Sequence, residues 1–310
     1  MNGRALVLMV TMALVPGVGA QCRAADGAQD AGSAPRPDVA GKIRELSSAD
    51  ASRRAAAACA LAGMAAGAAS AVPPLVRLLA DESAVSPELV CYRGIEPSSG
   101  GEFEGLRKPS PGEAAAQALI AIGKPAVEPL VEALADGRPQ VRKNAAWALA
   151  EIRDERAADP LVKALSDEAW QVRAFAAIGL GELGGGRAVE PLIAALQSEK
   201  NAQVRWYAAA SLGRFRDPRV VAPLIAALKE GEPRVRAYAA ASLGQVQSLL
   251  AVEPLIAALS DESAQVRMYA AASLGQMRDR RAVGPLTAAL NDRDRQVRVY
   301  ARAALDQFKE

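Results

Sequence analysis

From residue 126 onwards, apolar residues recur at helical spacings. After Val235, alanine follows at the fourth position, leucine at the eighth and another apolar residue at the eleventh. At about 100° per residue these positions lie within about 80° of one another around a helix. The pattern therefore predicts an amphipathic helix with one apolar face, in which Leu243 and its equivalents belong to the core.

The same pattern returns at Val266, 31 residues after Val235 (266 − 235). Pro-Leu pairs recur between the Val-Arg helices and predict a second helix in each unit, because proline is tolerated in a first helical turn. One such pair of helices cannot bury its apolar face alone, so stacking on neighbours must fold it. The signature pairs are Val141-Arg142, Val172-Arg173, Val204-Arg205, Val235-Arg236, Val266-Arg267 and Val297-Arg298.

The repeated units carry a longer shared pattern, V-R-x-x-A-A-x-x-L-G, followed by a turn of the form D-x-R-A-V-x-P-L, as at residues 279–286. These units resemble the HEAT-like repeats of the phycobilin (PBS) lyase type. The resemblance covers roughly residue 38 to the C-terminus. It implies an all-α fold, an α-solenoid (α-α superhelix) of about eight helix pairs with a period of about 31 residues.

The first residues have the pattern of a secretory signal. Arg4 precedes an apolar run, and Val18-Gly19-Ala20 has the small residues of a cleavage site. We expect a signal peptide over 1–20, with cleavage after residue 20 or 24, and export to the periplasm or the medium. Residues 21–37, rich in Ala, Gly, Asp and Pro, are expected to form a disordered linker.

The repeats are expected over 38–310, with helices at about 38–47, 51–64, 72–80 and 113–122 before the regular units. The interval from Leu61 to Leu119 exceeds one period by 27 residues (119 − 61 − 31). The excess is a stretch rich in Pro, Gly and Ser. We therefore expect an inserted loop at 82–111, a length that is uncommon inside a compact array and usually functional or disordered.

Composition removes several kinds of chemistry. The chain has no histidine, which excludes imidazole metal sites and histidine acid–base or nucleophile pairs. Its three cysteines are too few for an all-cysteine zinc site. The net charge of +2 gives no reason to expect nucleic acid or an anionic membrane as partner. We expect no catalytic residues, metal or cofactor, no membrane span after signal cleavage, and a monomer.

A third set of positions lies opposite the apolar face: the second, third, sixth and tenth residues after each signature valine. In repeats that these resemble, this arc lines the concave surface and varies with the partner. Aromatic residues with few charges are typical of protein-binding surfaces. An alternative left open for the tyrosines is packing between adjacent repeats. The predicted partner-binding residues are Lys143, Trp147, Glu151, Phe175, Ile178, Glu182, Trp206, Tyr207, Arg214, Tyr238, Met268, Tyr269 and Tyr300.

Charged residues recur with the same period. Each signature arginine is preceded by an acidic residue six positions earlier, as Asp261 precedes Arg267. A row of arginines could bind phosphates, but the matched acids favour a row of ion pairs inside the array. Cys59 is expected on the concave side and Cys91 in the insert, and the two form a candidate disulfide in an oxidising compartment.

These observations favour an exported, non-catalytic scaffold that binds a protein or peptide of unknown identity on its concave surface. One alternative is an enzyme-type HEAT-like protein, for chromophore attachment or as an accessory to an oxidoreductase, as the resemblance implies. Another is a purely structural array in an envelope assembly. The fold alone does not decide between them, because such arrays host many functions.

Overall fold

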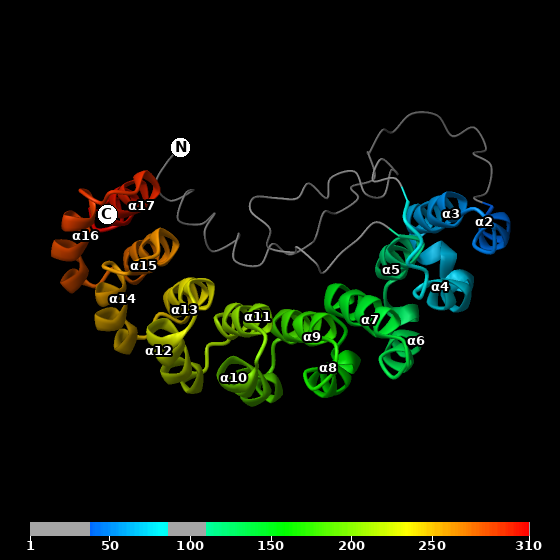
Figure 1. Ribbon diagram of the computed structural model, residues 1–310, viewed down its shortest axis with the longest axis horizontal. Helices are drawn as coiled ribbons and strands as arrows, with labels where there is room; N and C mark the ends of the chain where they lie inside the picture. The colour runs from blue at the N-terminus through cyan, green and yellow to red at the C-terminus, as the bar shows by residue number, and fades with distance from the viewer. Residues whose placement is uncertain (1–37, 86–109, 310) are drawn as a thin grey trace. The chain divides into compact units, whose positions relative to one another are not determined.

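The computed structural model describes residues 38–85 and 110–309, and in these ranges the chain is helical without strands (Figure 1). It forms two compact units, which we describe separately. The N-terminal unit comprises the described residues up to Gly179, and the C-terminal unit begins at Leu180. The predicted signal peptide, the linker and residues 86–109 of the insert lie outside the described residues.

The described helices form the eight expected pairs, so the predicted α-solenoid fold is confirmed. In the N-terminal unit they are α2 (Val39–Glu45), α3 (Ala51–Met64), α4 (Val72–Leu78), α5 (Pro111–Ile122), α6 (Val127–Ala133), α7 (Pro139–Ile152) and α8 (Ala158–Ala164), and α9 (Trp170–Leu183) continues into the next unit. The C-terminal unit adds α10 (Val189–Ser198), α11 (Ala202–Leu212), α12 (Val221–Glu230), α13 (Pro233–Val246), α14 (Val252–Ala258), α15 (Ala264–Met277), α16 (Val283–Ala289) and α17 (Arg295–Asp306).

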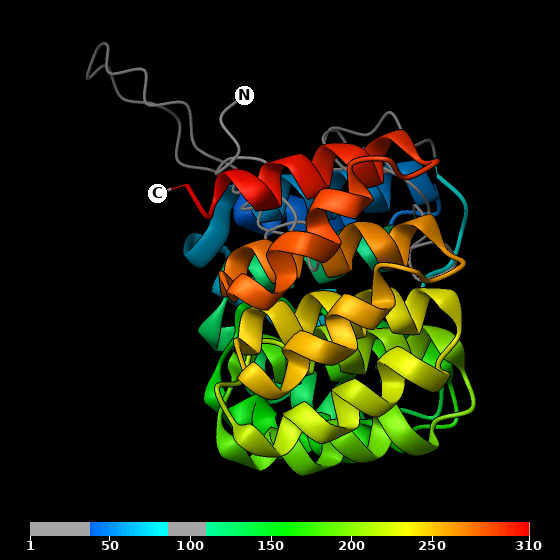
Figure 2. The same ribbon diagram turned by 90° about the vertical axis from the view of Figure 1, so that its left-hand side faces the viewer.

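Within each unit the helices form two layers. We call the even-numbered helices, which carry the Pro-Leu pairs in the regular repeats, first helices, and the odd-numbered ones second helices. In the C-terminal unit α11, α13, α15 and α17 follow one another in one layer, with α10, α12, α14 and α16 in the other (Figures 1 and 2). The core lies between the layers. Leu243 and Leu274, the expected core leucines, are fully buried there.

The helix after the insert begins two residues earlier than expected, at residue 111 instead of 113. Helix α5 begins at Pro111, because Ser110 caps it by accepting a hydrogen bond from the Glu113 N–H at 3.2 Å. Proline suits this first helical position, where its missing N–H is not needed. Gly112 takes the place of the signature arginine, and its N–H donates to the Asp81 carbonyl at 2.9 Å.

The stretch Ala51–Leu78 is apolar and long enough to cross a membrane by length and composition. It is not one continuous α-helix, since α3 ends at Met64 and Ala65 has a φ of 47°. Leu61 and Leu75 within it are fully buried in the N-terminal unit. Burial of these leucines explains the apolar composition as that of core helices.

Neighbouring second helices touch through a glycine and a serine. A Cβ added to Gly244 of α13 would lie 2.4 Å from the Ser273 Oγ of α15, closer than any real contact. The Ser273 hydroxyl donates to the Ala240 carbonyl of α13 at 2.9 Å. Gly213 meets Ser242 in the same way, and Ser242 donates to the Ala209 carbonyl at 2.8 Å. We call this contact the glycine–serine interlock.

The N-terminal unit has the interlock with its residues reversed. There the position of Gly244 is taken by Ala150, and the position of Ser273 by Gly179. A Cβ on Gly179 would lie 3.0 Å from the Ala150 Cβ. One member of each of these facing pairs therefore lacks a β-carbon, whichever helix carries it.

This rule predicts a compensating pair of substitutions. Gly244→Ala should lower the free energy of unfolding by about 1–3 kcal/mol, because the new methyl group overpacks the contact with Ser273. Adding Ser273→Gly should recover part of that loss by reproducing the Ala150–Gly179 arrangement. Urea denaturation monitored by circular dichroism measures both.

Gly284→Ala is the matched control, since an added Cβ there meets nothing within 4 Å. It should leave the unfolding midpoint unchanged or slightly raised. Equal losses from Gly244→Ala and Gly284→Ala, or a double variant no more stable than Gly244→Ala, would show that the interlock does not limit how closely these helices approach.

Candidate partner-binding face

The large aromatic residues predicted to bind a partner are buried, which corrects the expectation that they stand open to one. Trp206 is 2% exposed and Tyr238 is 1% exposed. The physical reason is the short distance between second helices, which lets each ring lie against the next helix. The predicted residues found buried are Trp147, Phe175, Ile178, Trp206, Tyr207, Tyr238 and Tyr269.

The buried rings of the C-terminal unit form a row. Trp206 stacks on Tyr238 with ring centroids 4.9 Å apart, and Tyr238 meets Tyr269 at 6.3 Å. The Arg234 guanidinium lies 5.5 Å from the centroid of the Trp206 ring, a favourable cation–π arrangement. These tyrosines, like Trp206, therefore pack between adjacent repeats.

Most of the remaining predicted residues keep some exposure. Lys143, Glu151, Met268 and Tyr300 are partly exposed and Arg214 is exposed, whereas the Glu182 side chain is nearly buried. Two of them form an ion pair within the C-terminal unit: Arg214 Nη2 lies 2.6 Å from Glu182 Oε1. Burial raises the pKa of Tyr300.

Two rows of glutamines on the same face were missed by the sequence reasoning. One row stands one residue before the signature valine and the other ten residues after it. At about 100° per residue, the first row lies about 20° and the second row about 40° around the helix from the sixth position after the valine. Their repetition at the period of the array was the signal that could have revealed them. In the C-terminal unit the glutamines are Gln203, Gln245, Gln265, Gln276, Gln296 and Gln307, with Arg234 and Arg214 at the two other places.

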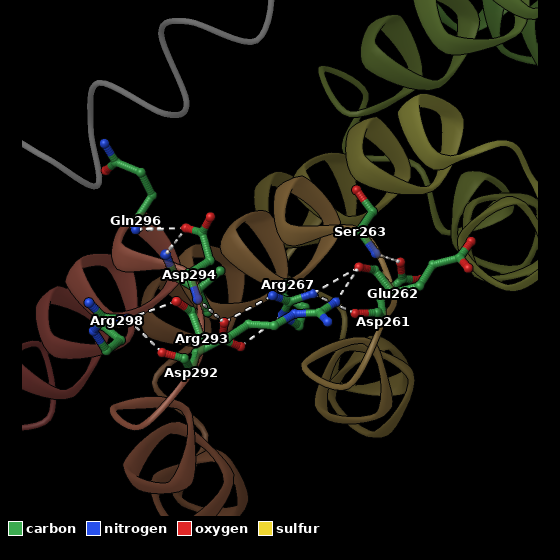
Figure 3. A network of polar contacts seen from close by, with 10 residues as sticks. Asp261, Glu262, Ser263, Arg267, Asp292, Arg293, Asp294, Gln296 and Arg298 are labelled. Carbon is green, nitrogen blue, oxygen red and sulfur yellow. Dashed lines mark hydrogen bonds and ion pairs between the residues drawn. The ribbon is translucent and has the colours of Figure 1, made fainter.

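The glutamine amides are largely unengaged. All six residues are partly or fully exposed. Gln307 accepts a hydrogen bond from Arg278 Nη2 at 3.2 Å, whereas the other five side chains bond to nothing in the described ranges. Figure 3 shows the Gln296 amide directed away from the polar network beside it, which only its backbone N–H joins. We call these residues, with the Tyr and Ala positions between the two rows, the glutamine face.

Most signature arginines pair with acids of the following repeat, and not of their own. Arg267 Nε lies 2.7 Å from Asp292 Oδ2, and its Nη2 lies 2.9 Å from Asp292 Oδ1 (Figure 3). Within its own repeat Arg267 donates only to backbone carbonyl groups, and its Nη1 lies 2.8 Å from the Asp261 carbonyl oxygen. The expected pairing of Arg267 with the Asp261 carboxylate was therefore wrong, and Asp261 instead accepts from Arg236 at 2.8 Å.

The same bond links other neighbouring repeats in each unit. Arg142 binds Asp167 at 2.7 Å, and Arg54 binds Asp81 at 2.6 Å, although no valine precedes Arg54. Arg205 pairs with Glu232, two residues beyond the expected place. The Arg142 and Arg267 side chains are nearly buried in these pairs. Such enclosed arginines do not form a phosphate-binding row.

A second row of ion pairs links neighbouring repeats on the side of the first helices. Arg219 lies 2.9 Å from Glu190 of the preceding repeat and also holds Asp217, and Arg281 pairs likewise with Glu253 and Asp279. The hydrogen bond from Arg281 lowers the pKa of Asp279 from 3.8 to about 2. At the equivalent place between them stand Leu249 and Leu250, which are 68% and 74% exposed.

Cys59 takes part in a disulfide bond, and its partner lies outside the described residues. The chain has two other cysteines, Cys22 and Cys91. The proposed bond to Cys91 therefore stays a prediction. In the ranges described, no group of three or more Cys, Asp or Glu residues is placed to hold a metal ion.

Sequence comparison assigns the repeats. HEAT repeats match the chain in three overlapping segments, residues 107–169, 158–244 and 221–306. The chain belongs to the HEAT repeat family. The HEAT-like character expected from the Val-Arg and Pro-Leu patterns is thus confirmed. No curated protein matches the sequence.

Solved structures share the fold of these HEAT repeats. The complex of CpcE and CpcF of phycocyanin lyase from a Nostoc species is 21% identical over 90% of this chain and 98% of its own, with a TM-score of 0.44. Escherichia coli YibA is 16% identical over 100% and 97%, with a TM-score of 0.57. Karyopherin Kap121p bound to the extreme C-terminus of the protein phosphatase Cdc14p is 13% identical, with a TM-score of 0.64, and is covered for only 33% of its length. At these identities the likeness to YibA and Kap121p shows the fold alone.

The arginine pairs predict a coupling between repeats. Arg267→Ala should cost about 3 kcal/mol of unfolding free energy, because it leaves the nearly buried Asp292 carboxylate without its main partner. In a double-mutant cycle Arg267→Ala should couple to Asp292→Asn and not to Asp261→Asn. Arg298→Ala is the matched control, since Arg298 donates to carbonyls of its own repeat and to no carboxylate in the described part of the chain.

The Arg267–Asp292 pair also predicts in which direction the stability of the protein changes with pH. The Arg267 hydrogen bond lowers the pKa of Asp292 from 3.8. A carboxylate with a lowered folded-state pKa stabilises the fold above its unfolded pKa, and this contribution is lost as the pH falls further. The difference in stability between wild type and Arg267→Ala should therefore be full at pH 7 and shrink below about pH 4. A difference independent of pH would contradict the pairing.

Proposed function

We propose that this HEAT repeat chain is an exported, non-catalytic scaffold that binds a protein or peptide on the glutamine face. The single observation that carries the proposal is the set of exposed, unengaged amides repeated from helix to helix. Amides left free on a regular surface are donors and acceptors available to a partner. The fold agrees with this use, since the similar Kap121p structure holds the terminus of another protein.

The proposal differs from the original aromatic-surface hypothesis in where the partner makes contact. Trp206 and Tyr238 are enclosed between repeats, so replacing them would damage packing before it reported on binding. Partner contact is assigned instead to the glutamines and to residues beside them with exposed apolar surface. Met268 is partly exposed, and Val299 at the same position of the next repeat is 40% exposed.

A capture experiment with paired variants tests the binding site. The full chain, immobilised, is exposed to an extract of the source cells, and retained proteins are quantified by mass spectrometry. Met268→Glu/Val299→Glu should lose the retained partner, because two carboxylates are brought to the edge of the glutamine face. Leu249→Glu/Leu250→Glu, which adds the same charge on the first-helix side, should retain it.

Both variants must first give the circular dichroism spectrum of the wild type. Should the Leu249/Leu250 variant lose the partner while the Met268/Val299 variant keeps it, the exposed leucines of the first-helix side are the binding surface and the proposal is wrong. Retention of no protein above the background of an unrelated helical protein would also count against a scaffold.

Export is supported by two separate features. The residue pattern of 1–20 is that of a cleavable signal, and Cys59 is disulfide-bonded, a state that persists in oxidising compartments. N-terminal sequencing of the purified native protein should begin near Gln21 or Ala25. An intact Met1 in a cytoplasmic fraction, with Cys59 alkylated without prior reduction, would refute export.

A further inference from the structure

Arg298 of α17 is anchored like the other signature arginines but holds no acid. Its Nη1 donates to the Asp292 and Arg293 carbonyl oxygens at 2.7 and 3.1 Å (Figure 3). The Nη1 of Arg267 donates to the equivalent two carbonyl groups of its own repeat, and its Nε and Nη2 then reach the Asp292 carboxylate. The Nε and Nη2 donors of Arg298 meet no acceptor in the described part of the chain.

Two further arginines lie beside Arg298 on α17. Arg295, three residues before it, and Arg302, four residues after it, both fall within about 60° of it around the helix. Both are exposed, and neither side chain forms a hydrogen bond or an ion pair within the described ranges. Asp306, on the same side of the helix, is paired with Lys309 at 2.8 Å. We call Arg295, Arg298 and Arg302 the arginine face.

The arginine face lies on the side of α17 that faces the following repeat in the other second helices. Arg302 stands five residues after its signature valine, within about 40° of the position at which Gly244 of α13 meets α15. The other repeats of the C-terminal unit have a fully buried alanine at this place: Ala209, Ala240 and Ala271. An arginine does not fit there under a closely packed helix, because its added volume overpacks the contact and its charge loses water. The ligand of this side is therefore not another repeat of the same kind.

The array itself shows which group suits such an arginine. Arg236 holds two adjacent acids, with Asp261 2.8 Å from its Nε and Glu262 3.0 Å from its Nη2. Arg142 holds the Asp167–Glu168 pair in the same way. A carboxylate matches the planar guanidinium, and such charge-assisted hydrogen bonds are among the stronger ones in proteins. An Asp-Glu pair is thus the unit that an arginine anchored in this way binds.

We propose that the arginine face binds an acidic segment of a partner protein, with an Asp-Glu pair on Arg298 and further carboxylates on Arg295 and Arg302. The three cations complement the charge of such a segment. This contact is independent of the proposed function, since the arginine face lies at least about 100° around α17 from Gln296 of the glutamine face.

The probe is a fluorescein-labelled peptide of Ser-Asp-Glu repeats, titrated with the full-length protein and followed by fluorescence anisotropy. Its affinity should fall when the salt is raised from about 50 to about 200 mM, because salt screens exposed charges. The same peptide with Asn and Gln in place of its acids should bind about tenfold more weakly, or less. Equal binding of the two peptides, or no binding of the acidic peptide at millimolar concentration, would show that the arginine face is only a solvated surface.

Two variants test the residues of the face. Arg295→Gln/Arg302→Gln removes two charges whose side chains hold nothing in the described ranges, so it should fold normally and lose about fivefold or more in affinity. Arg298→Lys keeps the charge but not the planar pair of donors, and should lose about threefold or more. Full affinity in both variants would refute the assignment.

The matched control is Arg77→Gln/Arg216→Gln, which removes the same charge from two exposed arginines outside the face. All variants must first give the circular dichroism spectrum of the wild type. The control should bind the acidic peptide as the wild type does. If it weakens binding as much as Arg295→Gln/Arg302→Gln, the peptide responds to the net charge of the chain and the proposal is wrong.

A competition experiment separates a protein ligand from a membrane surface. Vesicles rich in phosphatidylglycerol should displace the labelled peptide less than unlabelled peptide does at the same concentration of anionic groups, because the carboxylate pair fits the Arg298 donors. Stronger displacement by the vesicles would assign the arginine face to an anionic membrane and overturn the proposed acidic segment.

Discussion

The structure depends on how closely one second helix can approach the next. In the facing pairs from Ala150–Gly179 to Gly275–Ala304, a β-carbon is absent from one member, and where serine faces glycine its hydroxyl bonds the neighbouring backbone in at least two repeats. This close approach closes the core of alanine and leucine, which has few large residues to fill space. It also encloses the aromatic row, whereas the longer glutamine side chains remain exposed beyond it. The close approach of neighbouring second helices therefore determines both the core and the glutamine face.

Most of the fold was predictable because it is dictated by local spacing. The eight helix pairs follow from the recurrence of valine, leucine and proline, and α3 has the expected bounds of 51–64. The start of α5 at Pro111 was missed because its capping residue, Ser110, sits within a segment that reads as loop. Periodicity locates helices well and their caps less well, since a cap depends on one hydrogen bond.

The candidate site was less predictable, for two geometric reasons. In an array of period 31, the acid six residues before Arg267 and the acid 25 residues after it occupy the same place in the repeat. Spacing alone cannot tell Asp261 from Asp292, and only the structure shows that the bond reaches forward. Likewise, the angle of Tyr238 around its helix says which way the ring points but not that the next helix stands close enough to cover it. Residues beyond that cover, such as Gln276, carry the accessible chemistry.

Because the contacts on the two sides of α13 are alike, a repeat of this kind could stand at any position between similar repeats of the array. Another unit carrying serine, leucine and glycine at the same places would fit between existing neighbours without new complementary surfaces, and its loss would leave matching surfaces behind. Gene duplication or deletion of one unit would therefore change the length of the array by one repeat, while the contacts between neighbouring repeats stay the same.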